Sequence, residues 1–220
     1  QSGVHQYVER IAEINSLNQD IADRCAYRKD VHKAYLKHKK EADFAWNAES
    51  SLEMLAGYIE MQKMLMLFVD KLDEIDANED EIKDETVVHK DVSKAYFAYA
   101  KTLDLTWSAD KGVEALDAHI AIQQHCLEFV ELRSKVAENN NNINKLKSKA
   151  SAIHKVYATY FKGCDLSWTT DVDFAAINAV LDVQDRYLSG IDNPDIEAIN
   201  KQVKKEKIND IEQVLILVSE

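Results

Sequence analysis

The sequence contains few residues that end a helix. Its 220 residues include only one proline and five glycines. Proline lacks a backbone donor and glycine loses the most entropy on folding, so their scarcity leaves few places where a helix must stop. With 46% apolar and 30% charged residues, the composition is typical of a soluble globular protein. We therefore predict an all-α fold with a substantial core.

Long apolar runs and paired cysteines are also lacking. The longest apolar run, Met64 to Val69, is far shorter than the roughly 20 residues that cross a bilayer, so we predict no membrane span. Cys25, Cys126 and Cys164 are odd in number and fall on apolar faces of expected helices, as small core residues do. This favours an intracellular, reducing compartment, with a mature exported domain as the alternative.

Positive charge is in the minority, and motifs for chemistry are absent. A net charge of -12 opposes binding to the phosphate backbone of duplex nucleic acid. The seven histidines form no His-Glu-x-x-His or Glu-x-x-His pattern, and no Gly-rich phosphate loop, Gly-x-Ser-x-Gly or Cys-x-x-Cys occurs. We expect no metal, no cofactor and no enzymatic activity. A helical enzyme assembled from distant side chains is a third-ranked alternative.

What the sequence does contain is an ungapped 61-residue repeat. Val31-His-Lys-Ala-Tyr35 recurs as Val92-Ser-Lys-Ala-Tyr96 and as Ile153-His-Lys-Val-Tyr157. Units that recur stack on one another, since none buries its apolar face alone. The sequence therefore predicts tandem 61-residue helical hairpins, stacked as an α-solenoid or an elongated antiparallel bundle.

The period divides the chain into a single helical repeat domain with a half unit at each end. The expected segments are 1–16, 17–77, 78–138, 139–192 and 193–220, the last being a half repeat or cap. About eight helices follow, near 2–14, 17–42, 47–75, 78–103, 108–136, 141–163, 169–189 and 194–217. The half units suggest terminal caps or continuation into further repeats.

Local capping signals set these boundaries. Ser16 with Gln19 and Asp76 with Glu79 have the spacing of capping boxes, and the asparagines from Asn139 form a polar break. Asn47, Ser108 and Thr169 are the expected N-caps of the second helices. In the alternative, no breaks occur near Ala77 and Asn139, and each second helix runs straight into the next first helix, as in spectrin-like rods.

Six positions are identical in all three copies, and four of them suit structural roles. A tryptophan beside a helix start can close the hairpin corner, and a nearby aspartate can serve the free N–H groups of the second helix or pair with the lysine three residues back. A glutamine on an apolar seam needs a partner, for which the tyrosine hydroxyl is the candidate. These positions are Tyr35, Tyr96 and Tyr157; Asp43, Asp104 and Asp165; Trp46, Trp107 and Trp168; and Gln62, Gln123 and Gln184.

The other two identical positions are lysines, which point away from the tyrosine stripe. At 100° per residue, the first lysine of each unit lies about 160° from the tyrosine and about 20° from the second lysine. In stacked units they would form a basic track for an acidic ligand or partner. The alternative is that they complement helix C-termini or bridge to acidic residues of the next unit. The track comprises Lys33, Lys40, Lys94, Lys101, Lys155 and Lys162.

Two hypotheses about function follow. The first is a non-enzymatic scaffold that binds another protein or an acidic ligand through its repeated surface. The second is a structural or surface-exposed spacer domain that belongs to a longer array of repeats. A groove carrying lysines or exposed apolar residues favours the scaffold, whereas a straight, evenly charged rod favours the spacer. The sequence does not identify the partner.

Overall fold

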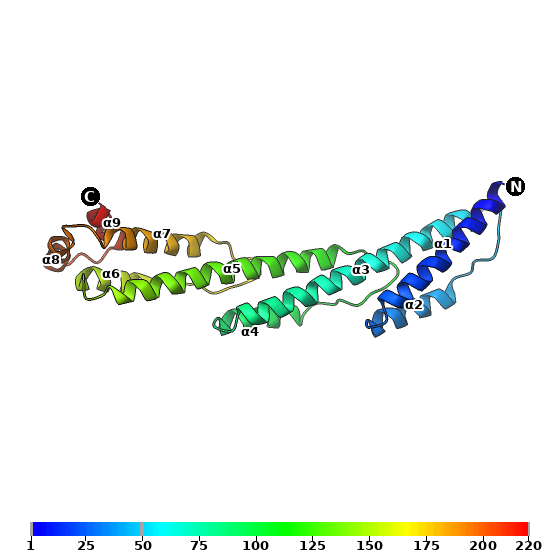
Figure 1. Cartoon of the computed structure of the whole chain (residues 1–220), viewed down its shortest axis with the longest axis horizontal. Coiled ribbons are helices and arrows are strands. Elements are labelled where there is room, and N and C mark those ends of the chain that lie inside the picture. Colours follow the sequence, from blue (N-terminus) through cyan, green and yellow to red (C-terminus); the bar gives the residue numbers. More distant parts are fainter. Residues whose placement is uncertain (1, 49–50, 220) are drawn as a thin grey trace. The chain divides into compact units, whose positions relative to one another are not determined.

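The computed structural model describes residues 2–48 and 51–219, and over these ranges it contains α-helices and no strands (Figure 1). The all-α prediction is confirmed, with about nine helices instead of eight. The helices are α1 (Ser2–Arg24), α2 (Lys29–Glu41), α3 (Ser51–Glu85), α4 (Lys90–Ala100), α5 (Glu114–Lys145), α6 (Ser151–Lys162), α7 (Ala175–Gly190), α8 (Ile196–Glu206) and α9 (Ile211–Ser219).

The predicted breaks near Ala77 and Asn139 are wrong, because α3 and α5 run through them without interruption. The break at Ser16 is absent from α1 in the same way. In each case two fully buried residues lie seven positions apart across the expected break, and this heptad spacing keeps the helix in register. The pairs are Ile14 with Ile21, Ile75 with Ile82, and Val136 with Ile143.

The turns lie further along the chain, and they too recur at the repeat period. They occupy residues 25–28, 86–89 and 146–150, and each joins a long helix to a short one. Side chains tie two of them to the next long helix: Arg28 binds Asp73 and Asp76 at 2.5 and 2.7 Å, and His89 bonds Ser134 at 2.9 Å. Asp76 thus binds an arginine instead of starting a helix.

Two of the second helices begin later than predicted. Ser108 and Thr169 belong to the irregular segments 103–108 and 164–169, whereas α5 and α7 begin at Glu114 and Ala175. Ser108 and Thr169 instead close local turns, in which their carbonyls accept the N–H groups of Lys111 and Val172. The N-caps predicted at Ser108 and Thr169 are therefore wrong, because these residues stabilise a turn that precedes the helix. The carbonyl of Asn47 accepts the N–H of Ser51, and residues 49 and 50 between them lie outside the described residues.

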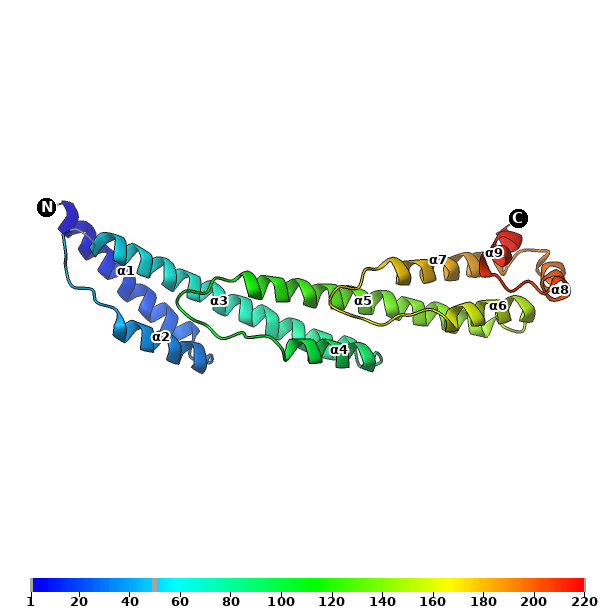
Figure 2. The ribbon, with the colours of Figure 1, turned by 180° about the vertical axis from the view of Figure 1, so that it is seen from behind.

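The chain forms two compact units. The first comprises Gln1–Lys83 and Ala100–Gln124. In it, α1, α2 and the first half of α3 lie side by side, as both ribbon views show (Figure 1 and Figure 2). Its core gathers apolar residues from all three helices around Ile14, Tyr35, Leu65 and Phe68.

The second unit comprises Asp84–Tyr99 and His125–Glu220. Its core includes Tyr157, Tyr187 and Leu215, and α8 and α9 both pack against α6. The single helix predicted over 194–217 is split into α8 and α9 by a turn in which Lys207 adopts a left-handed backbone (φ 55°). Helix α9 folds back along α7.

Candidate functional site

The identical glutamines form a hydrogen-bonded junction inside the helical core. The amide nitrogens of Gln62, Gln123 and Gln184 each donate to a backbone carbonyl 48 positions earlier, at 3.2, 2.9 and 3.0 Å. All three side chains are fully buried. A buried amide that donates to a helix carbonyl fixes the rotation and height of one helix against another. The same junction therefore recurs at the repeat period.

The predicted bond between glutamine and tyrosine is present in two of these junctions. Gln62 donates to the Tyr35 hydroxyl, and Gln184 donates to the Tyr157 hydroxyl, both at 2.9 Å. Each tyrosine hydroxyl in turn donates to an asparagine side chain, Tyr35 to Asn18 at 2.5 Å and Tyr157 to Asn140 at 3.0 Å. Burial raises the pKa of Tyr157, so its hydroxyl stays protonated and remains a donor.

Each of the two later tryptophans covers the tyrosine of the short helix in the preceding repeat. Trp107 meets Tyr35 edge-on with ring centroids 6.2 Å apart, and Trp168 lies 6.1 Å from Tyr96. These two tryptophans are 7% and 4% exposed. Trp46 differs, since it is 44% exposed and meets Tyr7 of α1 at 5.1 Å. The hairpin-corner role predicted for tryptophan is thus replaced by a contact between successive repeats of the sequence.

The identical aspartates act locally. The carboxylates of Asp43, Asp104 and Asp165 each accept the backbone N–H two residues further on, at 2.9, 3.0 and 2.9 Å. They shape the irregular segment before the second helix instead of capping that helix or pairing with the lysine three residues back. Hydrogen bonds from Thr106 and from Lys111 lower the pKa of Asp104 to about 2. This carboxylate therefore remains charged in mild acid.

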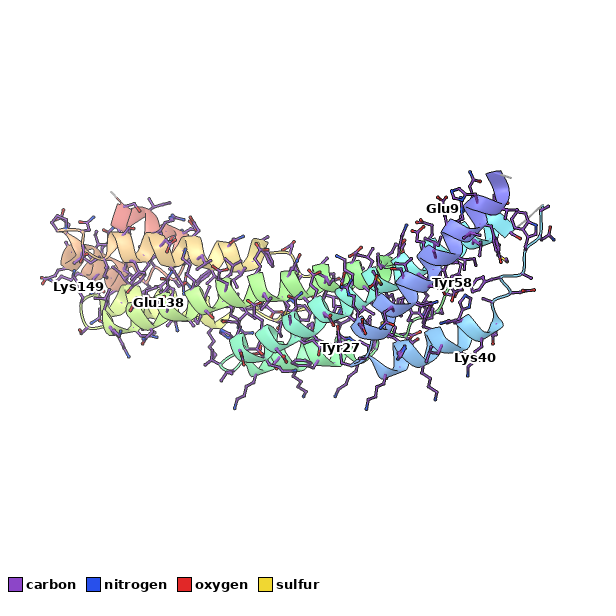
Figure 3. The ribbon with its side chains drawn as sticks, turned by 45° about the vertical axis from the view of Figure 1, so that its right-hand side comes forward. Glu9, Tyr27, Lys40, Tyr58, Glu138 and Lys149 are labelled. Atoms are coloured by element: carbon purple, nitrogen blue, oxygen red, sulfur yellow. The ribbon has the colours of Figure 1, made fainter. Side chains whose placement is uncertain are left out.

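The six track lysines lie on the short helices or at their ends, and all are exposed. Lys33 and Lys40 belong to α2, Lys155 and Lys162 to α6, and Lys94 to α4, with Lys101 just beyond it. Figure 3 labels Lys40, which projects from the outer side of α2.

None of the six ammonium groups forms an ion pair within the described ranges, which leaves out residues 1, 49, 50 and 220. Other lysines do pair: Lys63 binds Glu13, Lys71 binds Asp117 and Lys111 binds Asp104, at 3.1, 3.0 and 3.0 Å. Bridging to acidic residues, which the sequence left open for the track lysines, is therefore not seen for them. Their charges face solvent.

One track lysine borders an apolar groove in the second unit. The groove lies between α6 and α8, has a volume of about 310 Å³, and is floored by the buried side chains of Val156 and Val203. Lys155, Lys204 and Lys207 surround it. The left-handed backbone of Lys207, which ends α8, brings the third lysine to the rim. Sequence reasoning missed this groove, since α8 and α9 were expected to form one helix.

A related surface covers the outer face of α2 in the first unit. There Leu36 is exposed among Lys29, Lys33, Lys37 and Lys40. Both surfaces therefore combine lysine ammonium groups with accessible aliphatic carbon. Such a surface suits a ligand that carries carboxylates or phosphates beside apolar groups.

Several further titratable groups are buried in the core. Burial lowers the pKa of His89, His119 and His154, which keeps these imidazoles neutral, and burial raises the pKa of Cys126 to about 12, which keeps its thiol protonated near neutral pH. No group of three metal-ligating side chains occurs within residues 2–48 and 51–219. Over the same ranges, every helix is too short or too polar to span a bilayer.

The acidic stretch from Asp70 to Asp76 in α3 also has a structural role, which the sequence patterns did not predict. Arg24 binds Asp70, and Arg28 lies between Asp73 and Asp76. The partners are 45 to 48 residues apart in the chain, close to the 48-residue offset of the glutamine junction. That shared offset is the signal that could have revealed these pairs.

Comparisons of the chain with models of protein families, with curated proteins and with solved structures gave no significant match. The candidate site is therefore defined by its geometry alone.

Proposed function

We propose that the chain is a non-enzymatic helical-repeat scaffold, built from stacked 61-residue units, which binds an acidic partner through the outer faces of its short helices. The partner is another protein with an acidic segment, or an acidic ligand. The observation that carries this proposal is the exposure of all six track lysines without an ion-pair partner among the described residues, in a chain of net charge -12. Lys40 and Lys162 stand in the last turns of α2 and α6, where their charge also favours the helix C-terminus. Lys33, Lys94 and Lys155 lie nearer the starts of their helices, so that role does not account for them.

The geometry of the short helices supports the same proposal. Each buries one face through an apolar residue and a tyrosine, such as Val31 with Tyr35 or Ile153 with Tyr157, and its lysines stand on the opposite face. The groove between α6 and α8 adds an apolar floor beside Lys155. The lysine charges at the rim of the groove would attract an acidic partner over a distance, and the apolar floor would provide area for contact with that partner.

The test replaces one lysine on each short helix. The triple variant Lys33→Glu, Lys94→Glu, Lys155→Glu is titrated with polyglutamate and with inorganic polyphosphate by calorimetry at several salt concentrations. We expect binding to weaken at least tenfold in the variant, and the unaltered chain to lose affinity as salt rises, because the contacts are electrostatic. Circular dichroism checks that the helices are retained.

A second triple variant provides the control. Lys135→Glu, Lys145→Glu, Lys201→Glu makes the same change of charge at exposed lysines of α5 and α8. Equal binding by the two triple variants would show that net charge alone governs the interaction. That result, or no binding of either polyanion by the unaltered chain, would remove the basic surface as the site.

The second candidate function is a structural spacer within a longer array of repeats. The tryptophan that covers the tyrosine of the preceding repeat supports it, since that contact passes from one 61-residue unit to the next. A spacer predicts that the triple replacement on the short helices leaves every interaction of the chain unchanged. Retention of native partners by that variant in a pull-down would favour the spacer over the scaffold.

A further inference from the structure

The start of α1 exposes apolar side chains that the other copies of the same positions bury. Val4 is 54% exposed and Val8 is 57% exposed. One repeat later, Leu65 and Val69 are fully buried in α3, and a further repeat on, Cys126 and Val130 are buried in α5. Trp46 is exposed in the same unit, against Tyr7. We call Val4, Tyr7, Val8 and Trp46 the α1 surface.

These residues occupy one part of the first unit. On a helix with 100° per residue, Val4, Tyr7 and Val8 fall within about 100° of one another. Trp46 contacts Tyr7, and a side chain added at Gly3 would lie 3.6 Å from its ring. In the later unit, Trp168 rests on His125, the residue that corresponds to Gly3, with centroids 6.5 Å apart. One face of Trp46 is thus packed as in the other copies, and its other face is open.

The other copies identify what covers the open face. Trp107 is covered by Tyr35 of α2, and Trp168 by Tyr96 of α4. In both cases the cover is the tyrosine of the short helix in the preceding repeat. The ring expected to cover the α1 surface is therefore that of a tyrosine on a short amphipathic helix like α2 and α4.

A second copy of residues 1–220 cannot supply that tyrosine in its folded state. Tyr35 and Tyr96 are fully buried under the two later tryptophans, and Tyr157 is fully buried beside Tyr187. The helix that fits has to come from a unit whose tyrosine is still uncovered.

We propose that the α1 surface docks the tyrosine-bearing short helix of a further 61-residue unit, located upstream in the same polypeptide. The continuity of α3 supports this source. Residues 63–85 of α3 correspond to α1, and they follow without a break from Ser51–Gln62, the stretch whose Gln62 binds the preceding short helix through Tyr35. The inference rests on the repeat arrangement of the proposed function, but it is independent of the lysines.

The experiment adds one unit in register. Residues 1–62 are placed directly before Ser2 of the full chain, so that the added tyrosine precedes the original Trp46 by the same interval that separates Tyr35 from Trp107. Tryptophans are labelled as 5-fluorotryptophan, and the shift of each ¹⁹F resonance between H₂O and D₂O reports its exposure. Trp46→Phe variants of each copy assign the signals.

We expect the solvent-induced shift of the original Trp46 to fall to the values of Trp107 and Trp168, which corresponds to the loss of most of its 44% exposure. The matched control replaces only the tyrosine of the added copy by alanine, and there Trp46 should keep a larger shift. Failure of the lysine variants to alter polyanion binding would not affect this readout, so the two proposals fail separately.

Three results would overturn the inference. In the first, the added unit is helical by circular dichroism while Trp46 keeps its original exposure. In the second, the added unit adds no helical signal, since its folding depends on docking. In the third, the unextended chain buries Trp46 by dimerising in a concentration-dependent manner that Val8→Asp abolishes, which would make the α1 surface a self-association surface.

Discussion

The first and the second unit differ in how far equivalent repeat positions are exposed to solvent. In the first unit, Val4, Val8 and Trp46 stand exposed where the other copies are covered. In the second unit, the tyrosine that a following tryptophan would cover is closed off by the unit itself: Tyr157 lies 5.2 Å from Tyr187, and α9 packs on α6 and α7. The same repeat positions are therefore open to solvent in the first unit, whereas in the second unit side chains of that unit cover them.

Two residues account for the different packing in the second unit. Gly190 occupies the position of Tyr7, Phe68 and Phe129, and a Cβ placed there would lie 2.5 Å from the Val218 side chain. The only proline, Pro194, follows the end of α7, where α3 and α5 continue as helix. Proline ends the long helix, and glycine leaves space for α9 to return along it. Changes at two positions thus give the second unit a packing that α3 and α5 do not have.

The largest expected effect comes from restoring the aromatic residue of the other copies. Gly190→Phe should force α9 away from α7, because Val218 and its backbone carbonyl already lie within 3.2 Å of an added Cβ. We expect a loss of about 3 kcal/mol in the free energy of unfolding, near the upper end of overpacking costs. Urea unfolding followed by circular dichroism measures it.

Gly57→Ala is the control for that variant. Gly57 lies within α3, and no atom comes within 4 Å of an added Cβ, so alanine should stabilise the helix by about 0.5–1 kcal/mol. If Gly190→Phe unfolds at the same urea concentration as the unaltered chain, the packing of α9 on α7 does not depend on the glycine.

The next prediction tests whether the glutamine junction contributes equally to stability in the first and the second unit. Gln62→Leu and Gln184→Leu should each cost about 1–3 kcal/mol, since a buried carbonyl and a tyrosine hydroxyl lose their donor. Chemical denaturation measures both. Gln202→Leu, at an exposed position of α8, should stay within about 0.5 kcal/mol of the unaltered chain.

The losses in the free energy of unfolding of Gln62→Leu and Gln184→Leu are to be compared, and a marked difference between them would be informative. It would mean that the ends, and not the shared junction, determine how much each glutamine contributes. Equal losses would show that the junction is a property of the repeat itself.

The smallest expected effect concerns the strained turn between α8 and α9. Lys207→Gly should raise the free energy of unfolding by about 0.5–1 kcal/mol, because glycine adopts the left-handed conformation without the steric cost of a side chain. Lys207→Ala removes the charge but keeps that cost, so it should not stabilise. Thermal unfolding separates the two, and equal stability of both variants would argue against backbone strain at Lys207.

Sequence patterns predicted the features that follow from the position of a residue on its helix. The exposure of the track lysines follows from helical spacing, and the glutamine–tyrosine bond follows from the need of a glutamine on an apolar seam for a partner; both are present. The predicted breaks are wrong because the capping signals at Asp76 and Asn139 contribute less than the burial of Ile75 with Ile82 and of Val136 with Ile143. Here burial outweighed local propensity.

The same patterns do not predict features that distant segments of the chain form together. The groove between α6 and α8 exists because the chain folds back after Gly190 and Pro194, and no local signal places Lys204 and Lys207 beside Lys155. The aspartates were misassigned for the opposite reason, since an aspartate that bonds the N–H two residues on needs no helix at all.

The unbroken course of α3 constrains how such a chain can change in length. One residue inserted near Gly57 would rotate everything downstream in the helix by about 100° and carry Ile75 and Ile82 out of the core. Only the irregular segments 42–47, 103–108 and 164–169, and the turns, could absorb such an insertion. A gene encoding this protein therefore lengthens most readily by duplicating whole units, and the constant 61-residue spacing is the trace that such duplication leaves.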